Sequence, residues 1–355
     1  MGRQMRRDLL LECLRQLGAK SVLELRELGS GVHGKGYLLR VETASGQEEY
    51  VLKLVRAGGL GHDYPSDRAG MLLLALDSYN ALPKHVKAVD VLGRHADGSF
   101  HFLGGSKEYY LLTRKAEGTS YFSDLEAMAG KDALENADKA KIKTMAWYLA
   151  AIHSVKKTSR DLYLRRLRDV IGHGECLMGV FDTYPRGTLA QSIMTDIEKK
   201  CVDWRARLKS GYRRLSQVHG DFHPGNIWFK PNGSPADFVL LDRSRGPWGE
   251  PADDMAALAI NYIFFSVKFN GRIGGAYQQA IRLFFESYIK RTGDSAVLKY
   301  IQPFFAFRGA VVANPVFYPE LAGPGRKLIF NFVMNVLDSA QFDYSQASRY
   351  LSSSR

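Results

Sequence analysis

The sequence predicts an α+β protein with a small sheet-rich lobe followed by a larger helical lobe. Short β-prone segments alternate with glycine-containing turns through about the first 115 residues. From about residue 119 onward, apolar residues recur instead with the spacing of amphipathic helices. A chain of 355 residues is long enough for two such lobes. We therefore expect an N-terminal lobe over residues 1–117 and a C-terminal lobe over residues 118–355.

The N-terminal lobe is expected to begin with a helix and to continue as an antiparallel meander. Leucines at helical spacing over residues 5–17 predict an amphipathic helix that ends at Gly18. Glycine-containing turns then separate three β-prone segments, which are residues 22–28, 37–43 and 49–55.

The principal helix of this lobe is expected to follow the third strand. Residues 66–82 carry apolar groups at a helical repeat, with Ser66 or Asp67 as the N-cap and Pro83 as the end of the run. Further β-prone runs within residues 86–114 bring the expected number of strands to five.

The chain carries 49 lysines and arginines against 37 acidic residues, a net charge of +12. Such an excess attracts anions, including nucleotides, phosphates, nucleic acid and acidic lipid. The basic residues are scattered, and their densest cluster, between Lys156 and Arg168, has the pattern of an exposed helix and loop. No RNP, KH or zinc-knuckle pattern accompanies them. A solvated basic surface is thus the preferred interpretation, with RNA binding as the alternative.

The cysteines and the hydropathy pattern indicate a cytoplasmic protein without a membrane segment. Cys13, Cys176 and Cys201 are an odd, widely spaced set without a CxxC pair, which disfavours a disulfide framework and a cysteine metal site. No apolar run approaches the roughly 20 residues that a spanning helix needs. The basic N-terminus leads into a leucine-rich helix pattern rather than a signal sequence.

The strongest chemical signal lies in residues 219–242. The run HGDFHPGN begins there and contains Asp221 and, five residues later, Asn226; an apolar segment that ends in Asp242 follows. This spacing is the one that seats a nucleophilic hydroxyl and holds a metal ion in phosphoryl transfer. We expect Asp221 to be the catalytic base. Asn226 and Asp242 offer the hard oxygen ligands that Mg²⁺ prefers.

The motifs HGDFHPGN and LLDRSRGPWGEPADDMA resemble the HGDxHxxN and IDxxxxxxGxPxxDLA signatures of the aminoglycoside phosphotransferase and choline kinase superfamily. The resemblance implies a bilobed protein-kinase-like fold, with ATP and Mg²⁺ as cofactors and a small-molecule hydroxyl as acceptor. It also implies that Asp254 braces the catalytic loop and that His219 is a structural hydrogen-bonding residue. Gly220 stands where protein kinases have an arginine, which favours a constitutively active small-molecule kinase.

The chain departs from the kinase patterns at two places. Arg243 and Ser244 follow Asp242 where the family usually has an aromatic residue, and His223 replaces a lysine common in protein kinases. Neither change removes a metal ligand, and we expect His223 to approach the γ-phosphate or the acceptor. The HxxxH spacing also fits a metal hydrolase, but zinc needs three or four ligands and no further His or Cys cluster lies nearby.

A glycine-rich turn over residues 28–36 (LGSGVHGKG) lies between two predicted strands. Its backbone amides can cover nucleotide phosphates, although glycine-rich hairpin turns also occur for steric reasons alone. The downstream motifs favour the nucleotide interpretation. The residues expected to contact phosphates are Gly29, Ser30, Gly31 and Gly34.

Lys53 lies in the apolar third strand, the position from which the kinase fold reaches the α- and β-phosphates. The following helix offers Asp67 and Asp77 as acidic partners for it, and we prefer Asp67. The end of the last strand, with Thr113 and Lys115, is expected to form the hinge whose backbone binds the adenine edge. ATP is the expected donor, with GTP as the alternative.

The acceptor site is expected in the C-terminal lobe, where Arg308 and Asn314 are the substrate candidates. The aromatic residues around them have the spacing of a helical core rather than of a ligand cage. The sequence shows no cluster of acids of the kind that binds polycationic aminoglycosides, which favours a neutral or anionic acceptor. An atypical protein Ser/Thr kinase and an inactive nucleotide-binding scaffold remain the alternatives.

Overall fold

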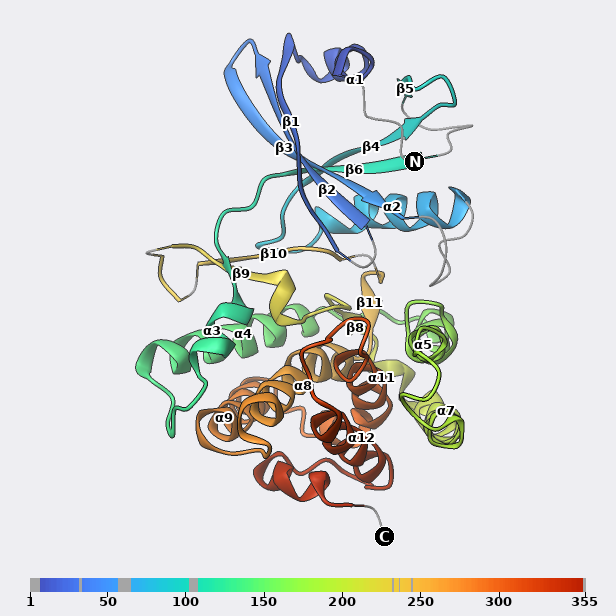
Figure 1. Cartoon of the computed structure of the whole chain (residues 1–355), viewed down its shortest axis with the longest axis vertical. Helices are drawn as coiled ribbons and strands as arrows, with labels where there is room; N and C mark the ends of the chain where they lie inside the picture. The colour runs from blue at the N-terminus through green and yellow to red at the C-terminus, as the bar shows by residue number, and fades with distance from the viewer. Residues whose placement is uncertain are drawn as a thin grey trace. The chain divides into compact units, whose positions relative to one another are not determined.

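A computed structural model describes the chain over most of its length (Figure 1). The described residues are 7–31, 34–56, 65–101, 108–231, 233–235, 237–243 and 245–353. They form two compact units. The first consists of Met1–Glu117 together with Val239–Ser244, and the second of Gly118–Phe238 and Arg245–Arg355. An antiparallel sheet followed by a mostly helical region confirms the α+β class expected from the sequence.

The first unit is built on a sheet with the strand order β1-β2-β3-β6-β4-β5. Its neighbouring strands pair antiparallel. The strands are β1 (Ser21–Ser30), β2 (Gly34–Thr43), β3 (Gly46–Val55), β4 (Ala88–Arg94), β5 (Phe100–His101) and β6 (Glu108–Arg114). The described part of the sheet thus has one strand more than the five expected, because the two-residue β5 pairs with the end of β4.

The helices of the first unit follow the predicted order with shorter bounds. Helix α1 (Arg7–Leu14) continues as a 3₁₀ turn to Leu17, and Gly18 ends it in the left-handed region at φ 83°. Helix α2 spans Pro65–Tyr79, so it ends three residues before the predicted end. Residues 5 and 6 of the predicted first helix lie outside the described residues.

The second unit is mostly helical, and its strands have two or three residues. Its helices are α3 (Tyr121–Ala127), α4 (Asn136–His153), α5 (Arg160–Gly172), α6 (Leu177–Asp182), α7 (Gln191–Leu208), α8 (Pro251–Asn270), α9 (Gly275–Thr292), α10 (Val297–Tyr300), α11 (Gln302–Val312) and α12 (Gly323–Leu337). Its strands are β7 (Thr119–Ser120), β8 (Ser216–Gln217), β9 (Ile227–Phe229) and β11 (Trp248–Gly249). Strand β10 (Phe238–Leu240) carries the chain into the segment that belongs to the first unit.

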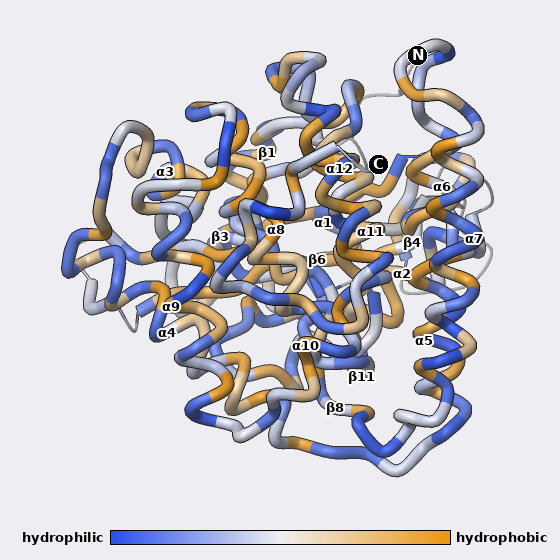
Figure 2. The backbone as a smooth tube through the Cα atoms, turned by 90° about the horizontal axis from the view of Figure 1, so that it is seen from below, coloured by the Kyte–Doolittle hydropathy of each residue, from blue (hydrophilic) through white to orange (hydrophobic). Residues whose placement is uncertain are grey.

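Helix α8 forms the centre of the second unit. Its residues 251–267 are all buried, and it packs against α9, α11 and α12. Helices α5 and α7 instead alternate between hydrophobic and hydrophilic residues, as expected of helices with one face on the core (Figure 2). In the part of the chain that the structure describes, no helix has both the length and the hydropathy needed to cross a membrane.

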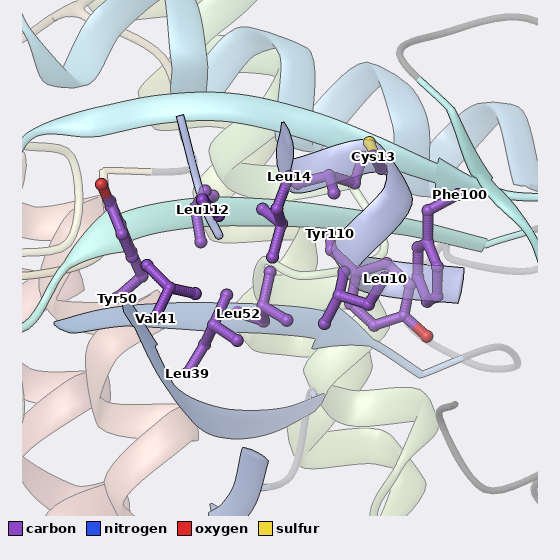
Figure 3. Packing of buried hydrophobic residues seen from close by; sticks show 12 residues of the cluster. Leu10, Cys13, Leu14, Leu39, Val41, Tyr50, Leu52, Phe100, Tyr110 and Leu112 are labelled. Carbon is purple, nitrogen blue, oxygen red and sulfur yellow. The ribbon is translucent and has the colours of Figure 1, made fainter. Parts of the chain in front are cut away.

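Two hydrophobic clusters cover the two faces of the sheet in the first unit. Leu52 and Leu112 belong to the cluster beneath α1 (Figure 3). Val55 and Leu111 belong to the cluster beneath α2. Successive side chains of a strand point to opposite faces, so the odd-numbered positions of β3 face α2. Lys53 therefore lies on the α2 face of the sheet.

The segment 239–244 is held in the first unit by backbone hydrogen bonds and by a buried arginine. Val86 N donates to Leu240 O at 3.2 Å, and Leu240 N donates to Lys84 O at 3.1 Å. Arg243 is fully buried, and its Nη1 donates to Ser78 O at the end of α2 at 2.6 Å. These contacts place Asp242, which precedes Arg243, on the same face of the sheet as Lys53.

Replacing Gly118 with alanine should destabilise the protein by about 1–3 kcal/mol through overpacking. Gly118 has φ +138°, and a Cβ would lie 2.6 Å from Phe229 O in β9. Gly172→Ala is the matched control, because a Cβ there meets no atom within 4 Å and alanine favours the helix. Thermal and denaturant unfolding would measure both variants. Equal stabilities of the two would contradict the close approach at Gly118.

Candidate functional site

The loop that carries Asp221 is anchored to the first turn of α8 through its backbone. Asp254 accepts hydrogen bonds from His219 N at 2.8 Å and from Gly220 N at 2.7 Å. His153 Nε2, from α4, lies 3.1 Å from the same carboxylate. Burial alone would raise the pKa of Asp254, but the His153 side chain and the loop N–H groups lower it below its ordinary value. The loop is thus tied to a buried, ionised acid.

Short side-chain-to-backbone hydrogen bonds shape the rest of the loop. His219 Nδ1 accepts from Asp221 N at 3.2 Å, and His223 Nδ1 accepts from Gly225 N at 3.1 Å. Gly225 has no room for a side chain, because a Cβ would lie 2.7 Å from His223 Cε1. Asn226 Nδ2 donates to Asp221 O at 3.0 Å. This bond uses the amide nitrogen, so Oδ1 is the Asn226 atom left to bind a cation.

Two arginines and a histidine surround the Asp221 carboxylate, which is 14% exposed. Arg308 Nη1 donates a hydrogen bond to Asp221 Oδ1. Arg245 Nε and His223 Nε2 each lie 3.8 Å from Oδ2. Burial would raise the pKa of Asp221, but Arg245 and Arg308 outweigh it and hold the pKa far below its ordinary value. The carboxylate is therefore kept ionised as a hydrogen-bond acceptor.

The first unit brings Lys53 and Asp242 together. Burial disfavours the charged Lys53 ammonium, but the Asp242 carboxylate, together with Tyr79, raises the pKa of Lys53 above its ordinary value. Burial also raises the pKa of Tyr79 to about 12, so its hydroxyl stays neutral. Tyr79 could not be singled out from the sequence, because its spacing on α2 is that of an ordinary core residue.

Asp242 has an unusual backbone conformation. Its φ is 54°, in the left-handed region that residues other than glycine rarely adopt. Such conformations persist where surrounding structure enforces them, and they cluster at functional sites. Asp242 and Asn226 both present hard oxygen donors, which suit Mg²⁺ rather than a thiophilic metal. The chemistry of these two side chains thus fits the predicted cation.

The predicted phosphate-binding turn has well-defined ends. Gly31 N donates to Gly34 O at 3.0 Å, while Gly29 and Ser30 are exposed at the end of β1. A Cβ at Gly34 would lie 2.1 Å from Leu54 O, so this position requires glycine. Val32 and His33 of the same turn lie outside the described residues. Contact between this turn and phosphates stays a prediction.

The remaining nucleotide-site candidates have structural partners of their own. Asp67 is exposed in the first turn of α2, and its pairing with Lys53 stays a prediction. Thr113 is buried in β6, paired across from Val51. Lys115 Nζ forms an ion pair with Glu49 at 2.8 Å.

The two substrate candidates of the C-terminal lobe have different surroundings. Arg308 reaches Asp221, as described above, while Asn314 is fully buried and donates to Thr183 Oγ1 at 2.8 Å. Asn314 Nδ2 also lies 3.4 Å from Val180 O, so it links the end of α11 to α6. Acceptor contact by either residue stays a prediction.

Three charged residues near the loop were missed as site residues by sequence reasoning. Arg245 could have been suspected, because it lies three residues after Asp242 in an unusually basic DRSR run. Asp253 lies beside Asp254 in the first turn of α8, where an acid is expected simply from its favourable interaction with the helix dipole. Arg166 belongs to a basic helix pattern, and nothing in the sequence distinguishes it from its exposed neighbours.

Solved structures share this fold at low sequence identity. The GDP and kanamycin complex of the aminoglycoside phosphotransferase APH(2″)-IIIa has a TM-score of 0.51 at 12% identity, over 89% of this chain and 95% of that one. An ethanolamine kinase from Plasmodium vivax has a TM-score of 0.51 at 13% identity, over 95% of this chain and 83% of that one. These likenesses confirm the expected kinase-like fold.

Comparison at the level of sequence identifies a family. No curated protein sequence matches the chain significantly. The model of the phosphotransferase enzyme family matches residues 24–284, which is more than half of the chain and includes Lys53, Asp221, Asn226, Asp242 and Asp254. The chain therefore belongs to the phosphotransferase enzyme family.

Proposed function

We propose that the protein transfers the γ-phosphate of ATP, with Mg²⁺, to a hydroxyl group of a small molecule. The observation that carries this proposal is the ionised Asp221 carboxylate, held on a loop whose backbone is bonded to Asp254. A fixed, ionised carboxylate is what an acceptor hydroxyl needs for alignment with a phosphoryl group.

Asp221 has the direct role with the acceptor. Its carboxylate accepts a hydrogen bond from the acceptor hydroxyl and takes the proton as the new O–P bond forms. The bond to the β-phosphate oxygen breaks in the same transfer, and ADP leaves. Holding the hydroxyl in line converts an encounter in solution into a positioned reaction, which is worth several orders of magnitude in rate.

Lys53, Asn226 and Asp242 are assigned to the nucleotide. Lys53, fixed on β3 beside Asp242, binds the α- and β-phosphates. Asn226 Oδ1 and the Asp242 carboxylate are the proposed ligands of Mg²⁺. When bound, the ion neutralises charge on the phosphate oxygens.

The charges around Asp221 support a neutral or anionic acceptor. Arg245 and Arg308 contribute two permanent positive charges beside the carboxylate, and His223 lies 3.8 Å from it. A polycationic aminoglycoside would be repelled by these groups unless acids elsewhere compensated for them. Sugars and hydroxyl compounds that carry a carboxylate or a phosphate fit this surrounding better.

Asp221→Asn should reduce phosphoryl transfer by about 10²–10⁴-fold, the range typical of removing a general base. Turnover of MgATP would be screened against sugars, hydroxy acids, amino alcohols, aminoglycosides and a generic protein substrate. Asp237→Asn is the matched control, because Asp237 is an exposed carboxylate in the same unit, 3.8 Å from Lys230. Unchanged transfer in Asp221→Asn would contradict the assignment, and phosphate found on protein alone would favour the protein-kinase alternative.

Lys53→Met should weaken MgATP binding by about 10–100-fold, as expected for the loss of a hydrogen bond to a charged group. Calorimetric titration would give Kd for the nucleotide. Lys20→Met, at an exposed lysine of the same unit, should bind as the wild type does. Equal affinity in Lys53→Met would contradict the nucleotide role of this lysine.

A further inference from the structure

We propose that Arg308 and Arg166 are positioning residues that clamp the Asp221 loop onto Asp253, a role that rests on the proposed function. Arg308 comes from α11 and Arg166 from α5, and Asp253 lies in the first turn of α8. All of these residues, and the loop itself, belong to the second unit.

Arg308 bonds to three groups of the loop and its support. Besides Asp221 Oδ1, it donates through Nη2 to Gly220 O at 2.8 Å and to Asp253 Oδ1 at 2.9 Å. The planar guanidinium has fixed donor directions, so it sets the angle between these acceptors. Its side chain is only 6% exposed, and its guanidinium carbon Cζ lies 4.6 Å from the centre of the Phe307 ring. Arg308 is therefore rigidly placed.

Arg166 repeats part of this pattern from a different helix. Its Nη2 donates to Asp253 Oδ2 at 2.5 Å and lies 3.3 Å from Gly220 O. Its Nη1 donates to Arg245 O at 2.9 Å, which fixes the backbone of the other arginine beside Asp221. Arg166 is also only 6% exposed.

Together these contacts fix both polar groups of Gly220, the residue before Asp221. Its N–H is bonded to Asp254, and its carbonyl oxygen is shared by Arg308 and Arg166. Gly220 has φ +84°, which a residue with a Cβ adopts at a cost. The direction in which the next side chain leaves the backbone is therefore set from three helices.

The contacts favour a positioning role over direct acceptor binding for these two arginines. Arg166, Arg245 and Arg308 bring three positive charges, and Asp221, Asp253 and Glu175 supply three carboxylates around them. A buried ion pair costs desolvation that its attraction only partly recovers, so it is weak evidence for stability. Arg166 and Arg308 instead donate their hydrogen bonds to the carbonyl oxygen of Gly220 and to Asp253. These bonds determine the geometry of the Asp221 loop.

The test uses Arg308→Gln, Arg308→Lys and Arg166→Gln in the full-length protein. We expect kcat for acceptor phosphorylation to fall by roughly 10²-fold in Arg308→Gln, because small misplacements of reacting groups have effects of that size. KM for ATP should change less than about twofold, since neither arginine is assigned to the nucleotide. Arg308→Lys should recover part of kcat, and Arg166→Gln should lower it less than Arg308→Gln.

Arg326→Gln is the matched control for a purely structural arginine. Arg326 lies on α12 and donates hydrogen bonds from its guanidinium group to the carbonyl oxygens of Ala313 and Tyr318 at 2.8 and 2.9 Å. Its loss should lower the thermal midpoint without a selective loss of kcat. A kcat loss in Arg326→Gln equal to that in Arg308→Gln would overturn the clamp.

A second readout does not depend on turnover. Hydrogen exchange of the amides in residues 218–226 should become about tenfold faster in Arg308→Gln, because the loop loses its anchor. Exchange in α12 should stay unchanged. Unchanged exchange in the loop would overturn the clamp, whereas a wild-type protein that phosphorylates no acceptor would overturn the proposed function instead.

Discussion

The site in the second unit depends on two adjacent acids, Asp253 and Asp254, at the start of α8. Both carboxylates are fully buried, so each requires partners. Asp254 accepts hydrogen bonds from the backbone N–H groups of His219 and Gly220. Asp253 accepts hydrogen bonds from the guanidinium groups of Arg166 and Arg308. Because α8 is buried along most of its length, these acids are held on a rigid element. The loop residues before Asp221 are therefore held firmly in place by their bonds to α8.

The sequence predicted the fold class and the main motifs because both rest on local patterns. Alternation and helical spacing identify β1 to β3, α1 and α2 to within a few residues. The β-prone runs within residues 86–114 predict two strands, and the structure has three there because the two-residue β5 pairs with the end of β4. The membership of residues 239–244 in the first unit depends on contacts with Lys84 and Val86, far away in sequence. Such long-range pairing leaves no local signal.

The site shows the same division between local and long-range information. Asp221, Asn226, Asp242 and Lys53 could be predicted from the sequence because phosphoryl transfer requires fixed residue types at fixed spacing. The arginines of the site, Arg166, Arg245 and Arg308, come from three separate segments, and arginine is common on exposed helices. Arg308 was expected to meet the acceptor, and the structure shows its guanidinium bonded to Asp221 and Asp253. Tertiary packing alone distinguishes these arginines from solvated ones.

The proposed reaction moves a phosphoryl group from ATP to a small-molecule hydroxyl. The most direct measurement is ³¹P NMR of the purified protein with MgATP and pooled hydroxyl compounds, followed over time. We expect a new phosphomonoester resonance that grows in step with ADP. Nucleotide binding without any new phosphomonoester, or release of inorganic phosphate alone, would contradict it.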